Sequence, residues 1–319
     1  MKFFAAAIIG FASANVDTKF MEYVSTHNKS YGTVEEYRFR LAQFAEADAL
    51  IEDHNSQNGS SFTLGHNKMS DWTTAERKRL LGYKPSMIPR ANSTVALTES
   101  NAAGVDWVTA GAVTPVKDQG QCGSCWSFSS TGSMEGVYQI KGNALTSFSE
   151  QQLVDCVTLC FGCNGGNFTT VFNQYAEANF MFLESAWPYN AKNGKCAEGT
   201  PTTAPTDMKT TGSVAVTPED VASLKSALNL NPVSVAIEAD KFKFQAYKDG
   251  VFDDSSCGTA LDHAVLLVGY GTDDQGQEYW IMKNSWGSSW GDAGYMKMAI
   301  IGNGPGTCGV MMDPVYATM

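Results

Sequence analysis

A cysteine near the middle of the chain lies in a segment suited to nucleophilic chemistry. Cys125 belongs to Gln119-Gly-Gln-Cys-Gly-Ser-Cys-Trp-Ser-Phe, where a glycine-bearing loop leads into a predicted helix over residues 124–141. The unpaired N–H groups and the positive dipole end of a helix N-terminus favour a thiolate. They can also donate to the oxyanion that forms when a thiolate attacks a carbonyl group, and the Gln119 amide is a second candidate donor. The segment predicts Cys125 as a nucleophile.

Only one histidine in the later part of the chain can be the base for this thiol. His27, His54 and His66 all precede residue 100, and His263 alone follows it. Imidazole changes its charge near neutral pH, which makes it the usual general base. His263 directly precedes an apolar β-type run at 264–268, which would hold the ring rigidly. A lone histidine is more often structural, but the candidate nucleophile favours a catalytic role.

Cys122 and Cys125 also form a Cys-x-x-Cys pair, so a redox or metal site is the alternative interpretation. Thioredoxin-like proteins carry an aromatic residue before such a pair and a βαβ pattern around it. Here Trp126 follows the pair, and no such pattern leads into it. A zinc site needs a second closely spaced pair of Cys or His ligands, which the sequence does not offer. We therefore expect neither a metal nor a cofactor.

The elements that must position these residues fall into two parts. Helical periodicity without any cysteine extends from about residue 16 to 72, and the stretch 84–104 then gains Pro, Ser, Thr and Ala, as in an exposed linker. From Val105 onward glycines and aromatic residues are frequent, a β-type run occurs at 233–237, and 168–179 is a further helical candidate. The sequence predicts an α+β domain behind a removable helical leader.

The first 14 residues are typical of a signal peptide. Lys2 provides a positive start, residues 3–11 an apolar stretch, and Ala12-Ser13-Ala14 a small-residue cleavage site. The apolar stretch is too short to span a membrane, so we expect no membrane anchor. Passage through the secretory pathway would permit disulfides.

The net charge of −11 is distributed unevenly. Acidic and basic residues balance before Asn101, and the whole excess of acidic residues follows it. Phosphate binding needs basic patches, so a nucleic-acid partner is not expected. An acidic surface suits an acidic compartment, where protonation of carboxylates limits self-repulsion.

Taken together, these segments resemble the papain-like cysteine proteases. Residues 119–128 are similar to the active-site segment of that family, Leu-Asp-His-Ala-Val at 261–265 to its histidine segment, and Lys-Asn-Ser-Trp-Gly at 283–287 to its asparagine segment. Cys-Asn-Gly-Gly at 163–166 matches the glycines of the cleft wall. The likeness covers nearly the whole chain and keeps the order of the family's motifs.

The leader resembles the inhibitory prosegment of the cathepsin L-like subfamily. Ala47 stands where the subfamily pattern carries Asn, and residues 65–71 resemble a second prosegment motif in which Met69 replaces Phe. The resemblance implies that the tail of the leader runs backwards through the cleft and that the mature chain begins near Asn101. We therefore expect a signal peptide at 1–14, a propeptide at 15–100 and a mature peptidase domain at 101–319. The matching pattern residues are Glu36, Arg40, Phe44, Ile51 and Asn55.

The resemblance also implies a two-lobed fold, with a helical left lobe and a β-barrel-like right lobe, and a set of catalytic roles. Cys125 attacks the peptide carbonyl, and His263 holds its proton and delivers it to the leaving amine. Asn284 orients the imidazole, Trp286 shields that contact from water, and Gln119 with the Cys125 backbone forms the oxyanion hole. The resting pair would be a thiolate and an imidazolium. No long histidine-bearing insertion follows Cys163, which favours an endopeptidase.

The chain has eight cysteines, all after residue 120. An even count suggests four bridges, but a thiol at Cys125 leaves seven, so one more must be unpaired or paired elsewhere. Sequence alone allows many connectivities. The resemblance implies Cys122–Cys163, Cys156–Cys196 and Cys257–Cys308, and leaves Cys160 as a free thiol or as an alternative partner of Cys156 or Cys163.

The main specificity pocket of this family binds P2, the second residue before the scissile bond. Most of the implied lining is small or apolar, which favours a hydrophobic P2 residue, and Asp313 maps to the pocket floor, where it would also admit Arg or Lys. Asp313 could instead turn away, because Pro314 follows it. The implied substrate-binding residues are Gly165, Gly166, Asn167, Phe168, Ala236, Leu261, Asp262, Ala264 and Asp313.

The expected partners are protein and peptide substrates, the chain's own propeptide and cystatin-type inhibitors, with the enzyme itself a monomer. The expected location is a lysosome, another acidic vacuole or the extracellular space. A catalytically inactive relative that only binds proteins is disfavoured, because all four catalytic positions carry the family's residue types. Release of the leader as a separate protease inhibitor is compatible with the main interpretation. The N-glycosylation sequons are at Asn28, Asn58, Asn92 and Asn167.

Overall fold

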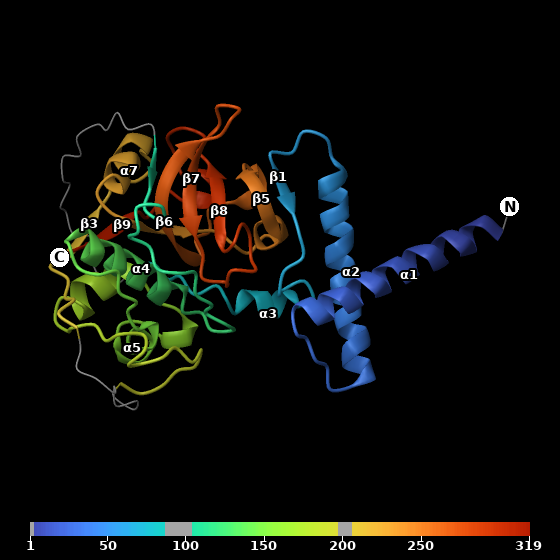
Figure 1. Ribbon diagram of the computed structural model, residues 1–319, viewed down its shortest axis with the longest axis horizontal. Helices are drawn as coiled ribbons and strands as arrows, with labels where there is room; N and C mark the ends of the chain where they lie inside the picture. The colour runs from blue at the N-terminus through green and yellow to red at the C-terminus, as the bar shows by residue number, and fades with distance from the viewer. Residues whose placement is uncertain (1–2, 87–103, 197–205) are drawn as a thin grey trace.

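A computed structural model describes residues 3–86, 104–196 and 206–319. The N-terminal segment, residues 3–86, lies beside the rest of the chain, and its first helix extends away from it (Figure 1). No helix among the described residues has both the length and the apolar character needed to cross a membrane. The expected mature start near Asn101, most of the expected linker and the Asn92 sequon lie outside the described residues.

Two long helices form the first part of the N-terminal segment. Helix α1 (Phe3–Thr26) crosses α2 (Val34–Ser56), and Thr33 caps α2 by accepting a hydrogen bond from the Glu36 N–H. Between them lies a small aromatic core, in which Phe20, Tyr23 and Phe44 are buried. Residues 3–14, which belong to the expected signal peptide, form the first half of α1.

The helical prediction is wrong beyond residue 56. Strand β1 (Phe62–Leu64) pairs antiparallel with β5 (Tyr247–Phe252) of the later domain, and only the short helix α3 (Thr74–Lys78) follows. Three residues become a strand here because a partner strand from another part of the chain completes their hydrogen bonds. Arg40 on α2 bonds Glu76 of α3 through both guanidinium nitrogens, at 2.7 and 2.8 Å, which ties the segment together.

The helical lobe is built around α4 (Cys125–Ile140), which confirms the prediction for 124–141 to within a residue at each end. Glycines at 132 and 136 let α4 approach the sheet, since a Cβ there would lie 2.7 Å from Leu266 and 2.6 Å from Pro232. The helix predicted at 168–179 is shorter and ends at residue 175. The other helices of this lobe are α5 (Glu150–Cys156), the 3₁₀ turn η1 (Gly162–Asn164), α6 (Phe168–Thr170) and the π turn η2 (Val171–Tyr175).

The second lobe is a strongly curved sheet with the strand order β1-β5-β8-β7-β6-β4-β9-β3, in which β2 also pairs with β6. Among the named strands of the described residues, all pairings are antiparallel except β5 with β8. The run predicted at 233–237 is β4 and that at 264–268 lies inside β6. The remaining elements are β2 (Val105–Asp106), β3 (Gly212–Ala215), α7 (Val221–Leu228), β4 (Val233–Ile237), α8 (Phe242–Gln245), η3 (Ser255–Cys257), β6 (His263–Thr272), β7 (Glu278–Lys283), β8 (Tyr295–Ala299), η4 (Thr307–Gly309) and β9 (Val315–Thr318).

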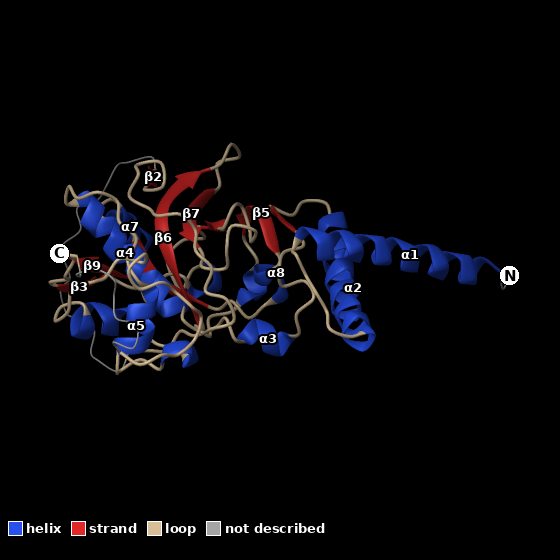
Figure 2. Cartoon of the chain, turned by 60° about the horizontal axis from the view of Figure 1, so that its bottom comes forward, coloured by secondary structure: helices blue, strands red, loops and turns tan. Residues whose placement is uncertain are grey.

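The two lobes have separate hydrophobic cores, one under the sheet and one around α4, which confirms the expected two-lobed α+β fold (Figure 2). The structure forms the disulfides Cys122–Cys163, Cys156–Cys196 and Cys257–Cys308, the pairs that the resemblance implies. Cys125 and Cys160 are free and buried. The first bridge ties the loop before α4 to η1, and the second ties the end of α5 to residue 196.

Candidate active site

Cys125 is the first residue of α4 and lies at the junction of the two lobes. Its side chain is fully buried, and Sγ accepts a hydrogen bond from the Ala264 N–H of β6 at 3.4 Å. Burial raises the pKa of the Cys125 thiol to about 11, against the opposing effect of N–H groups from Ala264, Gly82 and Trp126. In this form of the molecule the group is therefore a thiol and not a thiolate.

His263 is the first residue of β6, opposite Cys125. Its Nε2 lies 2.9 Å from Oδ1 of Asn284, and the Ser285 N–H donates to the same oxygen at 2.8 Å. Because Oδ1 accepts, Nε2 carries the proton, and Nδ1 is the nitrogen left for Cys125. The ring of Trp286 lies 4.7 Å from that of His263 and is fully buried. Burial lowers the pKa of His263 to about 4, so the imidazole is neutral.

Gln119 is fixed beside Cys125 by bonds from both lobes. Its Oε1 accepts from the Ser285 hydroxyl at 2.7 Å, and Nε2 donates to the carbonyls of Cys122 at 2.8 Å and of Leu80 at 2.9 Å. The Leu80 carbonyl comes from the N-terminal segment. The donor that the sequence assigns to an oxyanion is therefore already bonded to a carbonyl oxygen of the same chain.

The tail of the N-terminal segment occupies the cleft between the lobes. Tyr83 and Gly166 form a parallel β-bridge, in which Gly166 donates to the Gly82 carbonyl at 2.8 Å and accepts from Lys84 at 2.9 Å. The Tyr83 N–H also donates to the Asp262 carbonyl at 2.9 Å. Lys84, expected to begin an exposed linker, thus has its backbone in the cleft while its side chain is exposed.

The approach is closest at Gly82. A Cβ at this position would lie 1.8 Å from the carbonyl oxygen of Gly123, so that no side chain fits between the two backbones. Gly123 in turn donates to the Cys163 carbonyl at 2.9 Å, which fixes it to the cleft wall. Leu80 and Gly82 together cover the thiol and its oxyanion donor.

Tyr83 fills the predicted specificity pocket. Its side chain belongs to the same buried cluster as Phe168, Ala236 and Ala264, with Leu261 packed at the edge, and its ring lies 5.7 Å from that of Phe168. The phenol donates a hydrogen bond to Oδ2 of Asp313. Asp313 therefore faces into the pocket and does not turn away.

The remaining predicted residues lie around the same cleft. Gly165 has a φ of +113°, and the Asn167 amide donates to the Lys84 carbonyl at 3.0 Å. The Asn167 side chain also caps α6, accepting from Thr169 N–H at 2.7 Å, so its buried nitrogen is not open to glycosylation. Of the other predicted sequons, those at Asn28 and Asn58 have exposed asparagines. The Asp262 carboxyl bonds the Ala239 N–H, and burial raises its pKa to about 7.

Cys160, the thiol without an assigned role, lies behind the cleft wall. Its sulfur accepts from the Asn167 N–H at 3.5 Å, and burial raises its pKa to about 11. It is not paired with Cys156 or Cys163, which are bridged to other cysteines.

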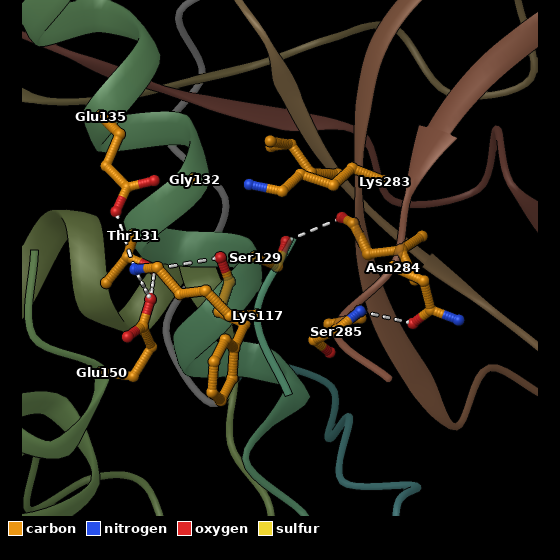
Figure 3. A pocket seen from close by; sticks show the side chains of 13 residues that line it. Lys117, Ser129, Thr131, Gly132, Glu135, Glu150, Lys283, Asn284 and Ser285 are labelled. Carbon is orange, nitrogen blue, oxygen red and sulfur yellow. Dashed lines mark hydrogen bonds and ion pairs between the residues drawn. The ribbon is translucent and has the colours of Figure 1, made fainter. Parts of the chain in front are cut away.

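A buried cluster of ionisable side chains lies behind the predicted catalytic residues and was not anticipated from the sequence (Figure 3). Lys117 bonds Glu135 at 3.0 Å and Glu150 at 2.6 Å, and Lys283 donates to the Thr114 carbonyl at 2.7 Å. Both carboxyls are almost wholly inaccessible to solvent. The cluster connects α4, which carries Cys125, with the end of β7, directly before Asn284. Glu135 was the one available signal, since it interrupts a helix of otherwise small or apolar residues.

This cluster predicts a pH dependence of stability. Burial raises the pKa of Glu150 from its ordinary value of 4.5 to about 8. The folded chain thus holds the Glu150 proton more tightly than the unfolded chain does. The protonated carboxyl therefore stabilises the fold fully below pH 4.5, and this contribution is lost as the pH rises towards 8. We expect the free energy of unfolding in urea to fall over this interval. A Glu150→Gln variant, permanently neutral, should show a smaller fall, and an equal or steeper fall would contradict the assignment.

Comparisons with known proteins agree with this geometry. Residues 101–318 match the papain family cysteine protease model, and residues 20–76 match the cathepsin propeptide inhibitor domain (I29). Digestive cysteine proteinase 3 of Homarus americanus is 40% identical over 328 residues, with 100% of both chains covered. Cathepsin L of Sarcophaga peregrina is 40% identical, with 93% of this chain and 91% of that protein covered.

A solved structure of digestive procathepsin L 3 from the Tenebrio molitor larval midgut matches with a TM-score of 0.82 at 35% identity, covering 95% of this chain and 99% of the other. The propeptide match includes the end of α1, the whole of α2 and the start of α3, and it ends shortly before the tail that enters the cleft. That segment acts as an intramolecular inhibitor. The chain belongs to the papain family of cysteine proteases and is the zymogen of a cathepsin L-like cysteine endopeptidase.

Proposed function

We propose that Cys125 is the nucleophile of this endopeptidase and His263 its general base and acid. The Cys125 thiolate adds to the peptide carbonyl, and His263 protonates the leaving amine to give an acyl-enzyme. Water, deprotonated by His263, then releases the acyl group. The supporting observation is the bond from His263 Nε2 to Asn284, because it leaves Nδ1 for the thiol. Asn284 and Trp286 are positioning residues.

The oxyanion of each tetrahedral intermediate would bind Gln119 Nε2 and the backbone at the start of α4. Gln119 is preorganised by its Ser285 bond, so little reorganisation would accompany the reaction. In the zymogen the Leu80 carbonyl takes this donor. Removal of the N-terminal segment would free Gln119 and let water and substrate reach the thiol.

The proposed processing removes residues 1–14 as a signal peptide and 15–100 as a propeptide, leaving 101–319 as the mature enzyme. The family match beginning at residue 101 supports this boundary. The enzyme would act in a lysosome, another acidic vacuole or outside the cell, as a monomer open to cystatin-type inhibitors. The relatives named as digestive proteinases support a secretory route.

Labelling with a thiol-directed epoxide tests the catalytic assignment. After acid activation, the reagent should modify Cys125, identified by mass spectrometry of the peptides, and abolish peptidase activity. Cys160 is an internal control, because it lies buried behind the cleft wall, takes no part in the proposed reaction and should stay unmodified. Cys125 is not the nucleophile if activity survives complete labelling, or if the reagent does not label Cys125 at all.

We further propose that the pocket takes hydrophobic P2 residues and, through Asp313, basic ones. Small and apolar walls would pack against Leu, Val or Phe, and the carboxylate would pair with Arg or Lys. Asp313→Ala should lower kcat/KM for an Arg-Arg substrate by about tenfold or more relative to Phe-Arg, since a buried charge then lacks its partner. Negligible Arg-Arg cleavage by the unaltered enzyme, with no effect of the substitution, would refute the basic part.

A further inference from the structure

Tyr189 joins the two chain segments that carry the proposed oxyanion donor and the proposed nucleophile. Its hydroxyl donates to the Gln119 carbonyl at 2.7 Å and lies 2.6 Å from the hydroxyl of Ser124, which directly precedes Cys125. Residues 119, 124 and 189 all belong to the expected mature domain, so these two contacts do not depend on the N-terminal segment.

Two further contacts fix Tyr189 in this place. Its ring meets the ring of Phe128, on the first turn of α4, edge to face at a centroid distance of 4.8 Å. Its N–H donates to Oε1 of Glu184 at 2.8 Å. The phenolic oxygen is therefore held beside the start of the helix that carries Cys125.

The directions of the two hydroxyl bonds follow from their partners. A carbonyl oxygen can only accept a hydrogen bond, so Tyr189 uses its single phenolic proton on Gln119. The Ser124 hydroxyl must then donate to the phenolic oxygen. The bridge thus fixes where the proton of the buried Ser124 hydroxyl points.

The phenol keeps its proton while the catalytic groups titrate. Burial raises the pKa of Tyr189, although the bond with Ser124 opposes this effect. The titratable side chains that face it are Glu150, Asp118 and Cys125, and each raises its pKa further, because a negative charge there would repel a phenolate. The bridge therefore stays the same across the acid and neutral range.

Ser124 is the N-cap residue of α4, where a serine side chain usually accepts a bond from an N–H of the first turn. Its side chain gives α4 no such bond, and its backbone, at φ −101° and ψ 13°, is not extended as in most capping residues. The Ser127 N–H already donates to the Ser124 carbonyl at 2.8 Å. A capping hydroxyl would therefore take the Trp126 N–H, which is one of the groups that favour a thiolate at Cys125.

We propose that Tyr189 is a positioning residue, which holds the Ser124 hydroxyl away from α4 and so keeps the Trp126 N–H for the Cys125 sulfur. Without the phenolic oxygen, Ser124 would cap the helix and withdraw that N–H. The thiolate would then form less readily, because hydrogen bonds to the charged form of a group favour that form. This inference rests on the proposed function, since it concerns how the same nucleophile is activated.

The test measures the rate at which iodoacetamide alkylates Cys125 in acid-activated enzyme, as a function of pH. The reagent attacks the thiolate, so the rate rises with pH along an acid limb. Tyr189→Phe should move this limb upwards by about one pH unit. Tyr138→Phe is the matched control, because its hydroxyl bonds Asp207 near the other end of α4, and its limb should coincide with that of the unaltered enzyme.

A second substitution separates positioning from general support of the fold. Once the Ser124 hydroxyl is removed, nothing is left to cap α4 in place of Tyr189. Tyr189→Phe combined with Ser124→Ala should therefore have the same acid limb as Ser124→Ala alone. A loss of packing at Tyr189 would not be repaired by deleting a second group. The proposal is wrong if Tyr189→Phe leaves the limb in place, or if the limb of the double variant stays above that of Ser124→Ala.

Steady-state kinetics gives an independent readout. The acid limb of kcat/KM for a dipeptide substrate also reports the free enzyme, so it should shift by the same amount in Tyr189→Phe. A shift of alkylation without one of kcat/KM would contradict the proposal. If alkylation of Cys125 leaves activity intact, the catalytic assignment itself fails. If alkylation abolishes activity and neither limb moves, only the role of Tyr189 is refuted.

Discussion

A zymogen with alanine at position 82 is expected to be active before any acid treatment. The Cβ of Gly82→Ala would lie 1.8 Å from the Gly123 carbonyl oxygen and 2.4 Å from its carbon, and both are backbone atoms with no rotamer to change. One backbone must move away. Gly123 is held by its bond to the Cys163 carbonyl and by the adjacent disulfide, so the N-terminal segment is the part that yields.

The displacement would break the contacts that make the enzyme latent. Overpacking of this kind costs about 1–3 kcal/mol, which weakens binding of the segment by about 5- to 150-fold. We expect activity on a dipeptide substrate at neutral pH to rise by a comparable factor, measured on the intact chain. Gly32→Ala is the control, since its Cβ would come no nearer than 3.8 Å to Glu36. Acid activation of both variants should yield the same mature enzyme, and a Gly82→Ala zymogen as latent as the control would contradict the prediction.

We expect the protonation of Cys125 and His263 to differ between the zymogen and the proposed active enzyme. Burial favours a neutral thiol at Cys125 and a neutral imidazole at His263 while the cleft is filled. An exposed cleft would let the proton move from sulfur to nitrogen and give the thiolate–imidazolium pair. This transfer takes up no proton from solution. The pair alone therefore cannot make release of the N-terminal segment dependent on pH, and any such dependence must come from other titrating groups.

Charged contacts between the segment and the rest of the chain are one place to look for such groups. Lys68 bonds Asp118 across this boundary, and within the segment an Arg40 hydrogen bond lowers the pKa of Glu76 to about 2. Because the pKa of Glu76 is lower in the folded segment, its carboxylate stabilises the fold above pH 4.5. This stabilisation is lost as the pH falls towards 2. Acid therefore weakens the segment's own fold.

The sequence could single out Cys125 and His263 as catalytic candidates because their identities and neighbours form recognisable local segments. Cys125 could be placed at a helix start from the glycines before it, and His263 at a strand start from the apolar run after it. Strand β1 could not be predicted, because its three residues become a strand only by pairing with β5. The Tyr83–Asp313 bond joins residues 230 positions apart, and local patterning does not encode such a contact.

The charged cluster was missed for a related reason. Lysine and glutamate are usually surface residues, so, apart from Glu135 in its helix of small and apolar residues, their presence in a helix or loop gives no sign of burial. Only the packing of α4 on β6 and β4, which depends on Gly132 and Gly136, encloses them. The cluster joins α4, which begins at Cys125, to the end of β7, directly before Asn284, so it connects two of the proposed catalytic residues.

Replacement of Glu135 by alanine is expected to lower the free energy of unfolding by about 3–5 kcal/mol, because it leaves buried cations without their anion. Glu135 accepts from Lys117 at 3.0 Å, from Thr114 at 2.6 Å and from the Phe148 N–H at 3.0 Å. Although burial opposes its ionisation, Lys117 and Lys283 lower the pKa of Glu135, so the carboxylate is charged. The substitution removes three bonds and the charge together.

Urea unfolding of the full chain carrying Cys125→Ser, which prevents self-digestion, measures this change. The matched control is Glu278→Ala, which breaks an ion pair with Lys225 on the surface and should cost less than about 1 kcal/mol. The cluster also holds the end of β7, where Lys283 directly precedes Asn284. If the cluster aligns the lobes, Glu135→Ala in the otherwise unaltered enzyme will lower kcat more than it raises KM. If Glu135→Ala loses no more stability than Glu278→Ala, the prediction is wrong. The bond from Lys117 to Glu150 would then suffice, and Glu135 would contribute little to joining the lobes.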